Sequence, residues 1–242
     1  MRVTTRTSLH SSQLLRLLSD WAAMDSAVAG GAFAQKLSLW VDYTDAIALH
    51  AVHNNPPSVA ATSGTVAAHA AAQELQQVRA RLERAIDSST LPLPETHTTP
   101  DTAGVFEPLR RYYLAQQRDL EAAVGPLRAK LREELGRASP ALRQLAALDA
   151  KLDSMLSERE SRLLYTVPKL LKRRFEHLLQ THQQTLQDPL QADNPALWMR
   201  PGAWLARFCS EMQSVLRAEL DLRLQPALGL LEALQQEQAQ QV

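Results

Sequence analysis

Cysteine, glycine and aromatic residues are all scarce in this 242-residue chain, and each scarcity excludes something. Cys209 is the only cysteine, so an intramolecular disulfide cannot form, which is consistent with a reducing compartment. Aromatic residues make up 5% of the chain and there are only 8 glycines, whereas Ala, Leu, Gln, Glu and Arg are abundant. This composition favours helices over strands, because strands are rich in β-branched and aromatic residues.

Neither an excess of one charge nor a long apolar run is found. The 26 Lys and Arg residues balance 26 Asp and Glu residues, so the chain as a whole has no general attraction to nucleic acid or anionic membrane. Charged and polar residues interrupt the apolar stretch near the N-terminus, which lacks the apolar core of a secretory signal. No run approaches the ~18 apolar residues of a membrane span. The expected location is therefore the cytoplasm.

Apolar residues recur at spacings of three and four through most of the chain, which predicts amphipathic helices. The predicted fold class is all-α: an elongated bundle of six to eight amphipathic helices with two flexible, proline-rich linkers. Helices are expected at about 11–24, 31–53 and 66–86 in the first part of the chain. The predicted division is an N-terminal helical pair at 1–57, a linker at 58–64, a helix at 65–87, a disordered linker at 88–104 and a C-terminal helical bundle at 105–238.

The C-terminal bundle is expected to begin with a helix at Phe106 or Pro108. Gly125-Pro126 is expected to kink or divide that helix, because proline removes a backbone donor. Ser139 and Pro140 form a favourable N-cap and first position for the next helix, and Pro168 begins another that ends near residue 187.

Two apolar patterns stand out in these helices. Leu145, Leu148, Leu152 and Met155 repeat at heptad-like spacings, until Arg159 breaks the pattern and argues against a long coiled coil. The last helix, from about 201 to 238, contains Pro226, where we expect a bend. Its apolar stripe recurs every ~3.6 residues, as in a straight helix, and consists of Leu205, Cys209, Met212, Leu216, Leu220, Leu224, Ala227, Leu231 and Leu234.

Residues 31–53 combine a strong apolar face with two aspartates and two histidines. If Asp42 is set at 0° on a helical wheel of ~100° per residue, Asp45, His50 and His53 fall at ~300°, ~80° and ~20°. The apolar residues, such as Phe33, Leu37, Trp40 and Ile47, centre near ~190°, so the polar side chains are expected to face away from the core. Asp42 and His53 are ~16 Å apart along the axis, so this helix alone cannot assemble a metal site. A solvated or partner-binding face is the better interpretation.

A basic cluster surrounds Phe175 in the helix that begins at Pro168. It would suit phosphates or anionic lipid, but it covers less than three turns and acidic neighbours such as Glu158 and Glu160 are available to neutralise it. A solvated face is the simpler interpretation. The cluster consists of Lys169, Lys172, Arg173, Arg174 and His177.

Sequence motifs for catalysis were not found. The chain has no HExxH, GxxxxGK[ST], GxGxxG or GxSxG pattern. Cys209 lies on an apolar stripe, so a buried, unreactive thiol is expected. Trp198, Trp204 and Phe208, together with Met199 and Met212, predict core packing at a helix start, with a partner-docking patch as the alternative. No catalytic residue, cofactor or metal is assigned.

Several segments resemble one protein family. FAQKLSLWVDYTDAIAL at 33–49 and AELDLRLQPALGLLEAL at 218–234 are similar to its two signatures, FAxxLxxWxDxTDAIxL and AELDLRLQPxLGLxEAL. SPALRQLAALDAKLD at 139–153 and VPKLLKRRFEHL at 167–178 match its middle, although Tyr43 stands where Trp is common. The family is a functionally uncharacterised group of bacterial proteins of about this length with a domain of unknown function. The resemblance implies genes beside those for an OmpA/MotB-like cell-wall-binding protein and a membrane partner, and hence a cytoplasmic accessory of an envelope complex.

Three functional hypotheses follow. The first is a non-enzymatic interaction or scaffold protein that binds a protein partner or itself. The second is a regulatory module that binds nucleic acid or the membrane surface through the basic cluster at 169–177. The third is a metal or acid–base site on the Asp/His face of the helix at 31–53. The candidate partner-binding residues are Asp42, Asp45, Lys169, Lys172, Arg173 and Arg174.

Overall fold

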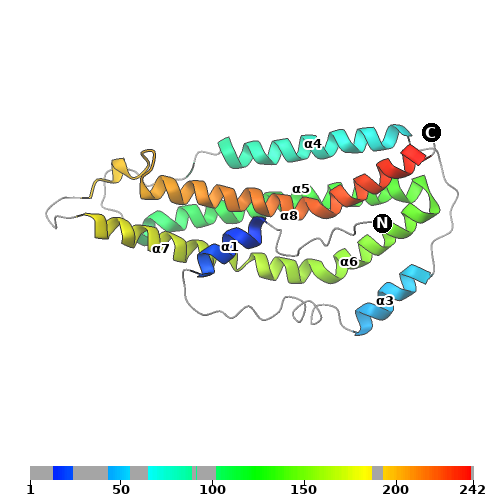
Figure 1. Ribbon diagram of the computed structural model, residues 1–242, viewed down its shortest axis with the longest axis horizontal. Helices are drawn as coiled ribbons and strands as arrows, with labels where there is room; N and C mark the ends of the chain where they lie inside the picture. The colour runs from blue at the N-terminus through cyan, green and yellow to red at the C-terminus, as the bar shows by residue number, and fades with distance from the viewer. Residues whose placement is uncertain are drawn as a thin grey trace, which may run out of the picture. The chain divides into compact units, whose positions relative to one another are not determined.

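The computed structural model describes residues 13–23, 43–54, 65–88, 91, 102–186 and 193–240 (Figure 1). These residues form helices and turns and contain no strand, so the all-α prediction is confirmed. Their helices are α1 (Gln13–Ala23), α3 (Tyr43–Asn54), α4 (Thr65–Ser88), α5 (Thr102–Ala138), α6 (Pro140–Leu164), α7 (Val167–Thr185), the short 3-10 helix η2 (Pro195–Leu197) and α8 (Trp204–Gln240).

Packing divides the chain into two compact units, and three long helices contribute to both. Unit 1 comprises Met1–Val28, Arg84–Arg118 and Thr166–Leu222. Unit 2 comprises Ala29–Glu83, Asp119–Tyr165 and Arg223–Val242, so α4, α5 and α8 each have residues in each unit. The predicted domain boundaries rest on linker composition and stay a prediction. The linker at 58–64 and most of the linker at 88–104 lie outside the described residues.

Aromatic rings form the centre of unit 1. Phe175 of α7 lies 5.2 Å from Phe208 of α8 and 5.3 Å from Phe106 of α5, measured between ring centroids. Trp204 lies 5.3 Å from Phe175 and 5.2 Å from Trp198. All five side chains are buried. The prediction of core packing for Trp198, Trp204 and Phe208 is therefore confirmed.

The apolar stripe predicted for the last helix is the buried face of α8. All nine predicted residues, from Leu205 to Leu234, are buried. Cys209 is among them, and burial raises the pKa of its thiol to about 12, so the prediction of a buried thiol is confirmed. Pro226 lies within α8, which continues through it to Gln240.

Helix α5 is longer than the sequence pattern predicted. It begins at Thr102 rather than at Phe106 or Pro108, since the additional turn buries Val105. It also runs undivided through Gly125-Pro126. Burial explains why the helix continues, because residues on both sides of the pair lie in the core. An interior proline costs about 3 kcal/mol, and that cost is offset by the burial of Leu120, Val124, Leu127 and Leu131.

Helix α6 begins as predicted but buries a different face from the heptad. Ser139 is its N-cap, and the Ser139 hydroxyl accepts a hydrogen bond from the Leu142 amide at 3.2 Å. The buried apolar side chains of α6 are Leu142, Ala146 and Leu164. Leu145 and Leu152 of the heptad pattern remain 37% and 36% exposed.

Paired charges explain which face of α6 packs against α5. Within unit 2, Arg128 and Arg132 of α5 both bind Asp149 and Asp153 of α6, with N–O distances between 2.6 and 2.9 Å. Burial would raise the pKa of Asp149, but hydrogen bonds from the two guanidinium groups outweigh it and the pKa lies below its ordinary value. A hydrophobic pattern cannot reveal such a contact, since its residues are all charged.

Candidate functional site

The predicted site residues on the second helix are only partly described. Asp42 lies outside the described residues, whereas Asp45 lies in α3. Asp45 Oδ2 is 4.0 Å from Nη1 of Arg159 on α6, and the Asp45 side chain is 21% exposed. The wheel placed Asp45 away from the core, and this orientation is wrong, because Asp45 faces α6. Partner binding by Asp42 and Asp45 stays a prediction.

The side of α3 that faces the protein differs from the predicted side by about 100°. The half-buried residues of α3 are Asp45, Ala48, Leu49 and Val52, which centre near ~290° on the same wheel. Ile47, predicted to lie on the inner face, is 53% exposed. Phe33, Leu37 and Trp40, which dominated the predicted face, lie outside the described residues. Within residues 43–54 alone, apolar residues lie both on the predicted face and on the face that contacts α6. The periodicity of this short segment therefore does not identify which face is buried.

The two histidines of α3 bind neighbouring polar groups. His50 is hydrogen-bonded to the Asn54 side chain at 2.9 Å, and the Gln144 amide of α6 donates to the His53 carbonyl oxygen. Both imidazoles are exposed. In the described ranges, no three His, Cys, Asp or Glu side chains are grouped closely enough to hold a metal ion.

The predicted basic cluster on α7 divides into two sets of residues. Lys169, Lys172, Arg173 and His177 are exposed, and Lys172 Nζ lies 3.7 Å from Glu176 Oε1. Arg174 instead is 7% exposed and points into unit 1. The expectation that Arg174 belongs to an exposed binding surface is therefore wrong. Binding of nucleic acid or membrane by the exposed set stays a prediction.

Arg174 holds α7 to α8 through a bidentate ion pair. Its Nε donates to Glu211 Oε2 at 2.6 Å and its Nη2 donates to Glu211 Oε1 at 2.7 Å. Arg207 Nε donates to the same Oε1 at 3.0 Å. The hydrogen bonds to Glu211 raise the pKa of Arg174 above its ordinary value. The charge of Arg174 was visible in the sequence, but its partner, 37 residues away, was not.

An incompletely covered apolar surface of unit 2 lies along α6. We name Leu145, Leu148, Leu152 and Met155 the α6 heptad face. Leu148 and Met155 are half-buried, whereas Leu145 and Leu152 are the exposed pair. Leu163, further along the same helix, is 49% exposed. The heptad face is apolar and incompletely covered, as surfaces for protein partners are.

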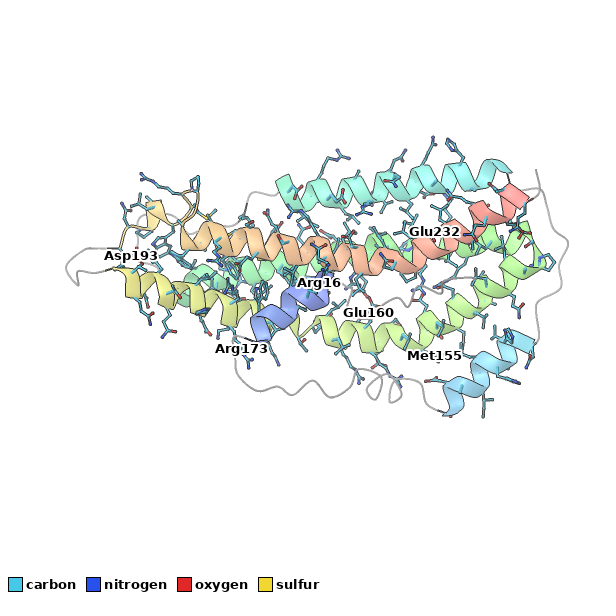
Figure 2. All side chains as sticks on the ribbon, viewed as in Figure 1. Arg16, Met155, Glu160, Arg173, Asp193 and Glu232 are labelled. Atoms are coloured by element: carbon cyan, nitrogen blue, oxygen red, sulfur yellow. The ribbon has the colours of Figure 1, made fainter. Side chains whose placement is uncertain are left out.

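Helix α3 packs along α6 (Figure 1). His53, near the end of α3, contacts Gln144, and Asp45, near its start, lies opposite Arg159, so the two helices are antiparallel. Met155 lies on the side of α6 that faces α3 (Figure 2). The two contacts are ~12 Å apart along α3 but ~22 Å apart along α6. Gln144 and Arg159 lie just outside the two ends of the heptad face, so the α3 contacts bracket the whole of it.

A buried carboxyl group in unit 1 was not among the predicted site residues. Glu219 of α8 is fully buried, and its Oε2 accepts hydrogen bonds from the Tyr113 hydroxyl at 2.8 Å and from Gln117 Nε2 at 2.9 Å. Both donors are buried side chains of α5. The available signal was its spacing, since Glu219 follows Met212 by seven residues and Leu216 by three on the buried stripe. This group fixes the register between α5 and α8.

We expect Tyr113→Phe to lower the free energy of unfolding by about 1–2 kcal/mol, because it removes a buried hydrogen bond to a carboxyl group. Tyr112→Phe is the matched control on the same helix. The Tyr112 hydroxyl is only half-buried and donates to the Ile86 carbonyl oxygen at 3.2 Å, so a smaller loss is expected. Urea unfolding of both variants measures the difference. Equal losses of unfolding free energy in the two variants would show that the hydrogen bond from Tyr113 to Glu219 contributes no more to stability than the Tyr112 hydrogen bond does.

Comparison with known proteins gives a family but no characterised relative. No curated protein and no solved structure matches the chain. None of the helices among the described residues is long and apolar enough to cross a membrane. One family model, described as a protein of unknown function (DUF3348), matches residues 1–236. Because that match covers nearly the whole sequence, the chain belongs to the DUF3348 family.

Proposed function

We propose that this protein is a non-enzymatic interaction protein that presents the α6 heptad face to a protein partner. The exposure of Leu145 and Leu152 carries the proposal. Two leucines one heptad apart would lie on the same side of α6, where a partner helix can contact both. Covering apolar surface contributes roughly 25 cal/mol per Å² to association. An exposed apolar surface of this kind favours binding to another protein over remaining in water.

The buried charged groups support a structural rather than a chemical role for the rest of the described residues. Glu219 accepts hydrogen bonds from Tyr113 and Gln117, and Arg174 is bound by Glu211. Each of these side chains joins two helices. Such networks hold helices in register without any catalytic role.

The cellular setting of the proposal rests on the family resemblance alone. We propose a cytoplasmic accessory of an envelope complex that contains an OmpA/MotB-like cell-wall-binding protein. In that setting, the partner of the heptad face would be a cytoplasmic helical segment of the complex. Self-association through the same face is the alternative. The two are distinguished by whether affinity capture recovers a different protein or a second copy of this chain.

Crosslinking and affinity capture from the native host, followed by mass spectrometry, test the proposal. Wild-type protein is expected to recover a stoichiometric partner, and Leu145→Glu/Leu152→Glu is expected to lose it, because two carboxylates would have to be desolvated in the interface. Ala150→Glu/Ser157→Glu is the matched control. Its two residues are exposed on another side of α6 and have the same spacing of seven. A wild-type protein without a partner, or equal recovery by both variants, would contradict the proposal.

A further inference from the structure

Helix α3 makes a shallow contact with α6, although it belongs to the segment that carries the N-terminal signature. None of the described side chains of α3 is buried, and those that face α6 (Ala48, Leu49 and Val52) are only half-buried. Helix α4 of the same unit instead buries Leu75 and Leu82. A helix of 12 residues is marginal by itself in water, so α3 depends on this contact. Its docking is therefore weak compared with the core helices.

The polar end of the α3–α6 contact is incomplete. Nη1 of Arg159 is buried and has no hydrogen-bond partner among the described residues. The Asp45 carboxylate lies 4.0 Å from this nitrogen, which is an ion-pair distance but too long for a hydrogen bond. A carboxylate placed ~2.8 Å from Nη1 would form a charge-assisted hydrogen bond. Arg159 thus has an unused capacity to bind an acidic group.

The apolar part of the contact is incomplete as well. The α6 heptad face repeats at the 3,4,3 spacing that accepts the a and d side chains of a facing helix. Helix α3 offers Ala48, Leu49 and Val52, which leave Leu145 and Leu152 more than a third exposed. A helix with a large apolar side chain at every a and d position would cover more of this surface.

We infer that α3 is an intramolecular cover of the α6 heptad face, and that an amphipathic partner helix with leucine-like residues at a and d and an acidic residue opposite Arg159 displaces it. This inference rests on the proposed function and adds the class of partner and its competitor. Helix α3 itself shows that a helix fits the site and that a carboxylate lies opposite Arg159. Because α3 occupies the surface, the apparent affinity for the partner is reduced by the fraction of molecules in which α3 is docked.

The test uses the full chain and a fluorescent three-heptad peptide as the probe. The peptide has leucine at every a and d position and glutamate at every e and g position, so like charges oppose its self-association. Hydrogen exchange is the main measurement. Binding is expected to slow amide exchange in residues 145–156 and to speed it in residues 43–54, where α3 is released. Slower exchange in both segments would overturn the inference, because α3 would then be part of the binding surface.

Variants give a second, independent measurement. Leu49→Asp, which weakens α3 docking, is expected to tighten peptide binding by roughly ten-fold, whereas Ile47→Asp, on the exposed side of α3, leaves the affinity unchanged. Arg159→Ala and a peptide with lysine at e and g are expected to bind more weakly. The inference would be overturned if Leu49→Asp bound the peptide no more tightly than wild type does. It would also be overturned if neither wild type nor Leu49→Asp bound the peptide.

The same experiment separates this inference from the proposed function. If Leu145→Glu/Leu152→Glu abolishes peptide binding while Leu49→Asp has no effect, the heptad face binds helices but α3 is not its cover. If the leucine variant binds the peptide as well as wild type does, the heptad face itself is excluded. That result would contradict both proposals, and affinity capture of the native partner would fail in the same variant.

Discussion

Phe208→Ala is expected to lower the free energy of unfolding by about 4 kcal/mol, because it removes a fully buried ring and leaves a cavity. The ring lies 5.2 Å from Phe175 and 6.3 Å from Phe106, so helices α5, α7 and α8 all lose contacts. Oriented aromatic pairs add about 0.5–1.5 kcal/mol each beyond their buried area. Urea denaturation, followed by circular dichroism, measures the loss. The effect is expected at any pH at which the protein is folded, since no charge is involved.

Two further variants make the Phe208 prediction specific. Leu197→Ala is the control, because Leu197 is 39% exposed and its truncation is expected to change stability by about 0.5 kcal/mol or less. If Phe208→Ala does not fold, Phe208→Leu retains most of the volume and is expected to cost about 1.5 kcal/mol. A Phe208→Ala variant as stable as Leu197→Ala would show that the three rings do not form a packed core.

Arg174→Ala is expected to cost about 3 kcal/mol of stability, because it leaves the Glu211 carboxylate without its bidentate partner. Glu211 keeps the hydrogen bond from Arg207, which limits the loss. Arg173→Ala is the matched control on the adjacent position of α7, and its exposed side chain predicts a change of about 0.5 kcal/mol or less. Similar losses of stability in both variants would contradict the conclusion that Arg174 is buried while the other residues of the basic cluster are exposed.

The pH dependence of the same variant gives a second measurement. Burial would raise the pKa of Glu211, but hydrogen bonds from Arg174 and Arg207 outweigh it and hold the pKa below its ordinary value. A lowered pKa in the folded state contributes stability at pH values above the unfolded pKa of about 4.3. That contribution is lost as the pH falls through the folded pKa. Unfolding midpoints between about pH 7 and pH 3 are therefore expected to fall less in Arg174→Ala than in wild type.

Prediction from sequence was most accurate where one face of a helix meets the core through apolar side chains alone. The nine residues of the α8 stripe were predicted from spacing, and all of them are buried. The Ser139 cap followed from two adjacent residues and needed no tertiary information. Both predictions depend on local geometry, which the amino-acid order carries directly.

The predicted buried face of a helix was wrong where ion pairs or residues distant in the sequence determine which face is buried. On α6, Asp149 and Asp153 face α5 because Arg128 and Arg132 bind them, so Leu145 and Leu152 remain exposed. On α3, a wheel drawn over a longer segment pointed Asp45 outward and Ile47 inward, and the structure has the opposite arrangement. A helical wheel identifies the most hydrophobic face of a helix. The face that is buried in the structure depends also on which residues of neighbouring helices it contacts.

The amino-acid sequence by itself determined the helical class, the apolar stripe of α8 and the cap of α6, since each depends on residues within a few turns of one another. Only the tertiary structure decided that Arg174 and Glu219 are buried, because their partners lie 37 and more than 100 residues away. It also decided that Leu145 and Leu152 of the heptad face remain partly exposed. The physical reason is that α5 binds α6 through charges on one face, which leaves Leu145 and Leu152 on another face partly exposed to water.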